Sequence, residues 1–134
     1  MAQVLGIGGI FFKSRDPKAL GEWYHQWLGV PVEYPWGASF NPKNLPPGAL
    51  GVWNPFDNKT SYFQPSTRDF MVNLIVDDLD GALAQVVEGG ATAVGEIEES
   101  EFGRFGWFID PEGNKVELWQ PPDPTGTEPN ESGT

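Results

Sequence analysis

One pattern occurs twice in the chain and constrains its fold more than any other feature. An apolar stretch, an aspartate, an amphipathic stretch and a glycine follow one another over residues 6–29 and again over residues 70–90. Aspartate is a preferred residue just before a helix, and glycine commonly follows the last helical turn. The equivalent positions of Asp16 and Asp78 therefore predict two related modules, each with a strand that leads into a helix.

Both predicted helices carry further local signals. In the first copy, Pro17 follows the capping aspartate and Gly29 ends the helix. In the second copy, Asp77 or Asp78 caps a helix over residues 79–88. Apolar residues recur at helical spacing in both stretches, at Leu20, Trp23, Tyr24, Trp27 and Leu28, and at Leu79, Leu83, Val86 and Val87. Each stripe predicts a helix with one face packed on the rest of the protein.

Alternation of side chains predicts the strands. The clearest case is a β-hairpin, in which residues 105–109 and 114–119 flank the turn sequence Asp110-Pro111-Glu112-Gly113. Further strands are expected over residues 4–13, 32–34, 49–53, 60–63, 70–76 and 94–98. Each module then has the order β-α-β-β-β and leaves one sheet face that needs a partner.

The expected fold class is therefore α+β. Two βαβββ modules, spanning about residues 4–64 and 70–121, would form a curved mixed eight-stranded sheet around a cleft, with the helices outside. Both modules belong to a single domain over residues 1–134. Residues 122–134 are rich in proline and polar residues, so we expect a disordered tail there.

The same alternation assigns side chains to the cleft. Glu117 stands in the middle of a hairpin strand beside large aromatic residues, where burying a charge is costly. The other residues expected to face the cleft are Gly9, Phe11, Gly51, Trp53, Met71, Asn73 and Trp119. Four glutamates crowd the strand before the hairpin, and we interpret Glu96, Glu98, Glu99 and Glu101 as protection of a sheet edge.

Composition excludes several classes of function. The net charge of −11 argues against binding to nucleic acid, which requires a cationic surface. No stretch approaches the roughly 20 apolar residues of a membrane span, and no signal peptide is visible. The chain has no cysteine, which excludes disulfides and fits a cytoplasmic protein. The single histidine, His25, lies off the apolar helix face and is expected at the surface.

The duplication, the helix pattern Asp16…Trp23-Tyr24…Leu28-Gly29 and the hairpin sequence DPEGNKVEL resemble the vicinal oxygen chelate superfamily. That superfamily includes glyoxalase I, bleomycin-resistance proteins and extradiol dioxygenases, and the resemblance covers about residues 4–121. Its metalloenzymes place His or Glu ligands at four cleft positions, which fall here on Gly9, Gly51, Met71 (or Phe70) and Glu117. Only Glu117 suits a divalent metal ion, so we expect neither metal nor cofactor.

The favoured hypothesis is a glyoxalase/bleomycin-resistance-like protein that binds a small molecule in an aromatic cleft. The ligand would contact Phe11, Trp53, Met71, Asn73, Trp107 and Trp119, and Glu117 with the acidic net charge would favour a cation. The resemblance also implies a homodimer. No nucleic-acid or membrane partner is expected.

Two other interpretations stay open. The first is an enzyme: a lyase or isomerase, either metal-dependent or with Glu117 as general base, and after that a ring-cleaving dioxygenase. The second is structural: the aromatic residues fill the cleft as ordinary core, and Glu117 pairs with Lys115, Arg104 or Arg68.

Overall fold

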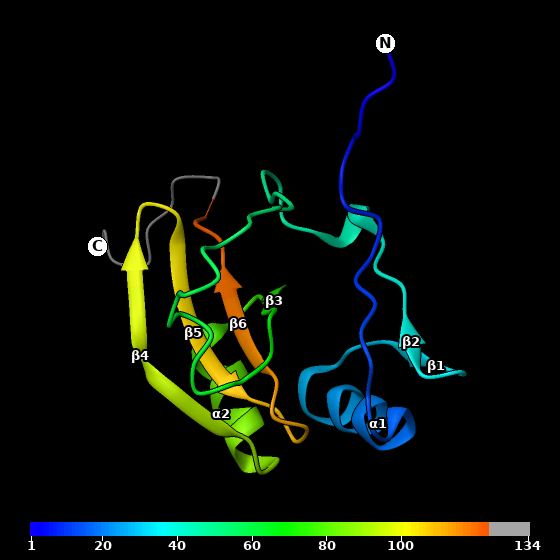
Figure 1. Cartoon of the computed structure of the whole chain (residues 1–134), viewed down its shortest axis with the longest axis vertical. Helices are drawn as coiled ribbons and strands as arrows, with labels where there is room; N and C mark the ends of the chain where they lie inside the picture. Colours follow the sequence, from blue (N-terminus) through cyan, green and yellow to red (C-terminus); the bar gives the residue numbers. More distant parts are fainter. Residues whose placement is uncertain (124–134) are drawn as a thin grey trace.

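The structure is a computed structural model that describes residues 1–123. Most of the predicted tail, from residue 124 on, lies outside the described residues. The elements in chain order are α1 (Pro17–Leu28), β1 (Val32–Glu33), β2 (Gly37–Ala38), a short 3-10 helix (Pro42–Asn44), β3 (Val72–Ile75), α2 (Leu79–Glu88), β4 (Thr92–Ser100), β5 (Gly103–Ile109) and β6 (Lys115–Gln120). The fold is thus α+β, with two α-helices, a two-stranded sheet and a four-stranded sheet (Figure 1).

The four-stranded sheet has the order β3-β6-β5-β4. β3 runs parallel to β6, whereas the other neighbours are antiparallel. α2 covers one face, where the core consists of Leu79, Ala82, Val86, Ala91, Phe108, Val116 and Leu118. Gly106 makes the close packing possible, because a Cβ at this position would lie 2.8 Å from Cδ1 of Leu83. The opposite face, called the open face below, carries Phe105, Trp107, Lys115, Glu117 and Trp119 by alternation along β5 and β6.

Both helix predictions are confirmed to the residue. Asp16 Oδ1 accepts a hydrogen bond from the Ala19 N–H at 3.0 Å, and Asp78 Oδ1 accepts one from the Gly81 N–H at 3.1 Å. Gly29 ends α1 with a left-handed φ of 66°. Neither α-helix in the described residues is long and apolar enough to cross a membrane.

The strands predicted for the N-terminal half are mostly absent. Residues 4–13, 49–53 and 60–63 form no strand, and the eight-stranded sheet is therefore not present within residues 1–123 of a single chain. A strand needs a neighbour to accept and donate its backbone hydrogen bonds, and within residues 1–123 no strand pairs with residues 4–13. Figure 1 shows this N-terminal segment as an extended trace that rises from α1 and belongs to neither sheet. The prediction that it is buried is wrong, since Val4, Leu5 and Phe11 are almost fully exposed.

The first helix nevertheless belongs to the C-terminal core. The indole N–H of Trp23 donates to the Gly89 carbonyl at 2.8 Å, and the Tyr24 hydroxyl donates to Asp110 at 2.8 Å. Burial first, and the neighbouring Asp110 charge and hydrogen bond next, raise the pKa of Tyr24. Both rings also contact Phe108. The helix of one half therefore packs against the sheet of the other.

Candidate functional site

A pocket of about 290 Å³ opens on the open face of the four-stranded sheet. Its lining comes from three parts of the chain: Phe56 and Tyr62 from the segment before β3, Glu98, Glu99 and Ser100 from β4, and Phe105, Trp107 and Glu117 from β5 and β6. Four of these side chains are aromatic and three are carboxylates. A second pocket, of about 380 Å³, lies at the β1–β2 hairpin and is lined by none of the predicted site residues.

Glu117 lies at the centre of a hydrogen-bond network. Its side chain is 9% exposed, and its Oε1 accepts from Asn73 Nδ2 at 2.7 Å. Its Oε2 accepts from the Tyr62 hydroxyl at 2.5 Å and from the Trp107 indole N–H at 3.0 Å. Asn73 can reach because it stands directly beside Glu117 in the β3–β6 register. Three neutral donors thus compensate the burial of this carboxylate.

The structure decides between the partners that the sequence left open for Glu117. Arg104 pairs instead with Asp80 at 2.9 Å and with Glu99 at 3.2 Å, and Arg68 donates to the Glu112 carbonyl. The Lys115 ammonium donates a hydrogen bond to the Tyr62 carbonyl at 2.5 Å and not to Glu117. Burial lowers the pKa of Lys115, and the Glu117 charge opposes this effect.

Tyr62 connects the segment before β3 to the four-stranded sheet. Its ring meets Trp107 edge-on, with centroids 6.1 Å apart, and stacks on Phe56 at 5.5 Å. Burial raises the pKa of Tyr62, and the hydrogen bond to Glu117 raises it further. Tyr62 therefore keeps its proton and acts as a hydrogen-bond donor to Glu117 at physiological pH.

The two neighbouring glutamates of β4 differ in their partners. Glu99 is bonded to Arg104, whereas Glu98 has no hydrogen bond or ion pair within residues 1–123. Glu98 lines the pocket and contributes to the raised pKa of Tyr62, after burial and Glu117. The sequence suggested only edge protection for this acidic stretch, and nothing in its spacing distinguishes Glu98 from Glu96.

The structure brings together some predicted site residues and separates others. Asn73 and Trp107 both donate hydrogen bonds to Glu117. Trp119 lies beside them, with its ring stacked on Phe105 and its indole N–H donating to the Phe102 carbonyl. The lining residues that were not predicted as site residues are Phe56, Tyr62, Glu98, Glu99, Ser100 and Phe105. Tyr62 lay in a segment with only a weak strand signal.

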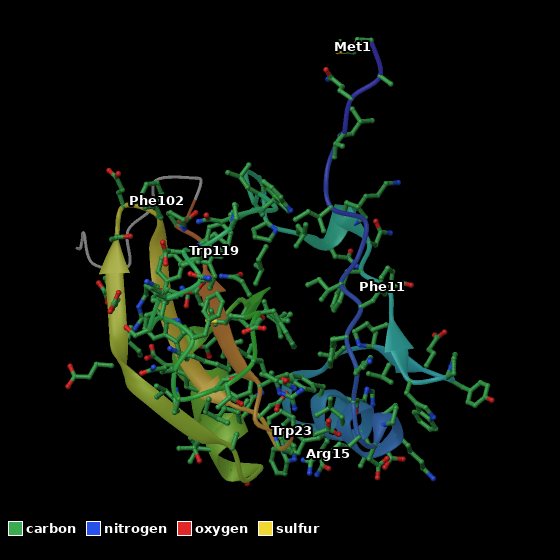
Figure 2. All side chains as sticks on the ribbon, in the orientation of Figure 1. Met1, Phe11, Arg15, Trp23, Phe102 and Trp119 are labelled. Atoms are coloured by element: carbon green, nitrogen blue, oxygen red, sulfur yellow. The ribbon has the colours of Figure 1, made fainter. Side chains whose placement is uncertain are left out.

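The remaining predicted ligand contacts do not reach this pocket. Phe11 is 95% exposed and Trp53 is 81% exposed. Met71 is half-buried and is not among the lining residues. In Figure 2, Phe11 lies on the N-terminal segment, well apart from Trp119 on β6. The sequence pattern placed these residues on one cleft by assuming a continuous sheet, and the single chain does not form that sheet.

The residues present do not fit the metal site of the superfamily. Within the described part of the chain, no group of three or more His, Cys, Asp or Glu side chains is arranged to hold a metal ion. Both oxygens of Glu117 already accept hydrogen bonds from the protein. The other three equivalent positions carry Gly9, Gly51 and Met71, which offer no hard oxygen or nitrogen side-chain ligand.

Comparison with known proteins identifies the class. The model of the glyoxalase-like domain matches residues 9–119, so the chain belongs to that family. This confirms the relationship to the vicinal oxygen chelate superfamily that the sequence motifs indicated. A search of curated proteins finds no match.

Solved structures share the fold at low identity. A protein of unknown function from Agrobacterium tumefaciens str. C58 is 19% identical with a TM-score of 0.52, over 87% of this chain and 98% of that one. The hypothetical protein SA1046 from S. aureus is 17% identical with a TM-score of 0.51, over 85% and 94% of the two chains. TnmS3, an antibiotic binding protein from Streptomyces sp. CB03234, is 24% identical with a TM-score of 0.47, over 80% and 88%. These similarities concern the fold alone.

Proposed function

We propose that this glyoxalase-like protein binds a small organic cation in the pocket on its open face, without a metal ion. The observation that carries the proposal is the unpaired carboxylate of Glu98 beside four aromatic rings. Aromatic faces attract ammonium groups through their quadrupoles, and a nearby carboxylate adds charge pairing. Glu99 and Glu117 are already engaged by Arg104 and by the Tyr62 network, which leaves Glu98 as the carboxylate that a ligand can pair with.

The test compares acetylcholine, used as a quaternary ammonium probe, with its neutral isostere 3,3-dimethylbutyl acetate. We expect the wild type to bind the cation more tightly, and Glu98→Gln to weaken that binding about threefold to fivefold, as for a solvent-screened ion pair. Binding of the isostere should not change. Isothermal titration calorimetry at low and high salt measures both, since screening reduces the contribution of Glu98.

The matched control is Glu96→Gln, which removes the same charge from β4 but outside the pocket lining. An equal loss in both variants would assign the effect to net charge and contradict a specific role of Glu98. Equal binding of the cation and the isostere by the wild type would exclude the cation preference.

We also infer that the chain acts as a homodimer. The N-terminal half exposes several large apolar side chains, and exposed apolar patches are typical of interfaces. These residues are Val4, Leu5, Ile10, Phe11, Leu50, Val52 and Trp53. β3 lies at an edge of its sheet, with β6 on one side only. A second copy covering these regions would bring the predicted modules, residues 4–64 and 70–121, into the expected eight-stranded sheet and add Phe11 and Trp53 to the cleft.

Sedimentation velocity tests the dimer. We expect a dimer for the wild type and a shift to monomer for Phe11→Asp, because a buried charge at the interface is costly. Phe102→Asp is the control, since Phe102 is also exposed but lies on the β4–β5 turn. A monomeric wild type would contradict the inference.

The alternative of a lyase or isomerase with Glu117 as general base stays a prediction. A base must accept a proton from the substrate, and each Glu117 oxygen already accepts hydrogen bonds from the protein. Catalysis by Glu117 would first require the release of Tyr62. Binding without such a step is the function that the geometry favours.

A further inference from the structure

Tyr62 is bound to the open face as a ligand would be. Its hydroxyl donates to Glu117 Oε2 at 2.5 Å, and its ring meets Trp107 at 87°. The Lys115 ammonium lies 5.2 Å from the centre of the Tyr62 ring and donates to its carbonyl. Phenol, indole and ammonium groups are therefore arranged around a single buried carboxylate.

The segment that carries Tyr62 has few other ties to the sheet. Residues 56–65 contain no strand, and their backbone bonds close local turns, such as Thr60 N–H to the Asp57 carbonyl at 3.0 Å. The side chains of Asp57 and Thr60 also bond only within the segment. The described hydrogen bonds that join residues 56–65 to the sheet are those of Tyr62. Tyr62 can therefore leave without breaking the sheet.

The Tyr62 hydroxyl is bound by Glu117, which is held in place by its neighbours in the sheet. Asn73 and Trp107 hold Glu117 from β3 and β5, and both donors belong to the sheet and not to the segment that carries Tyr62. Glu117 would then present Oε2 to a third donor next to the Trp107 ring. The group that fits is a hydroxyl on a flat ring, since it reproduces both contacts.

We propose that Glu117, Trp107 and Asn73 form a subsite for a hydroxyaryl group, and that Tyr62 fills this subsite until a ligand phenol takes its place. The subsite adjoins the pocket lined by Glu98, so this inference rests on the proposed function. The ligand of the pocket would then carry a hydroxyaryl group in addition to its positive charge. The tethered Tyr62 competes at high effective concentration, so it lowers the affinity of the wild type for phenols.

The experiment uses Tyr62→Ala with 4-methylphenol, which has the shape of the missing side chain, and toluene as the matched compound without the hydroxyl. We expect Tyr62→Ala to bind 4-methylphenol at least tenfold more tightly than toluene, because the hydroxyl bonds to a charged group. The double variant Tyr62→Ala/Glu117→Gln should lose that preference. Calorimetry gives the affinities, and the Trp107 indole N–H resonance reports binding at the subsite.

A milder variant keeps the test valid if Tyr62→Ala does not fold. Tyr62→Phe retains the ring and loses only the bond to Glu117, so it should bind 4-methylphenol more tightly than the wild type. Equal affinity of Tyr62→Phe and the wild type would overturn the proposal, as would equal binding of 4-methylphenol and toluene by folded Tyr62→Ala. The cation-binding measurements on Glu98→Gln do not enter these ratios, so a failure of the proposed cation binding is recognised separately.

Discussion

The two halves of the chain share a sequence pattern but not a packing state. Phe108 in the C-terminal half is fully buried between α2 and the helix α1, whereas Phe11 in the N-terminal half is 95% exposed. Both residues stand in alternating apolar stretches that predict strands. The difference shows that alternation indicates that a segment can form a strand. Whether the strand forms depends on a neighbouring strand that pairs with it.

The helices show the opposite behaviour. Asp16 and Asp78 cap α1 and α2 in the same way, although one helix belongs to each half. Capping joins residues three positions apart, so it needs no distant partner. Local capping signals therefore predict the helices correctly in both halves. The halves differ in strand pairing, which depends on residues far apart in the sequence.

The largest effect expected from this comparison is at Phe108. Phe108→Ala should lower the free energy of unfolding by about 3–5 kcal/mol, because it removes a fully buried ring and leaves a cavity. Phe11→Ala, measured in urea at concentrations where the chain is monomeric, should change it by less than about 0.5 kcal/mol. Similar losses in both variants would mean that residues 4–13 are packed within the monomer.

An intermediate effect is expected at Gly106. Gly106→Ala places a methyl group 2.8 Å from Leu83 Cδ1 and should cost about 1–3 kcal/mol through overpacking. Gly51→Ala is the control in the other half, where an added Cβ meets nothing within 4 Å. Thermal unfolding compares the two, and a stability loss for Gly51→Ala equal to that for Gly106→Ala would contradict the contrast between the halves.

The smallest effect concerns the contact that ties the N-terminal segment to the hairpin turn. Burial alone would raise the pKa of Glu112, but hydrogen bonds from the Arg15 N–H, the Ser14 hydroxyl and the Asp16 N–H outweigh it and lower that pKa below 4.5. A lowered folded-state pKa gives stability that is present above the unfolded-state value and is lost as the pH falls through the folded-state value. The protection factors of the Arg15 and Asp16 amides, which compare the observed exchange rate with the intrinsic rate at the same pH, should therefore fall in acid.

Glu112→Gln should lower the protection factors of these two amides already at neutral pH. It should also remove most of the decrease in these protection factors on acidification. Glu22→Gln is the matched control, because Glu22 lies on the exposed side of α1 and has no hydrogen bond in the described residues. Slow amide exchange that is unchanged in Glu112→Gln would show that other contacts hold the segment in place.

Part of the candidate site was predictable from the sequence. The position of Glu117 in the middle of a strand marked it as unusual, and the period of two placed Asn73 and Trp107 near it. Tyr62 could not be found in this way. Tyr62 lies on a segment without periodic structure, and the 55 positions that separate it from Glu117 give no local signal of their contact.

The sequence by itself determined the two helices, their capping residues, the C-terminal hairpin and the family, because each depends on residues close together in the chain. Only the tertiary structure decided that Glu117 is engaged by Tyr62 and that, within residues 1–123, Glu98 is left unpaired and the N-terminal apolar segment finds no strand partner. These outcomes depend on which distant groups meet. The free energy of such contacts comes from burial and pairing in space, and no pattern among neighbouring residues in the sequence reports it.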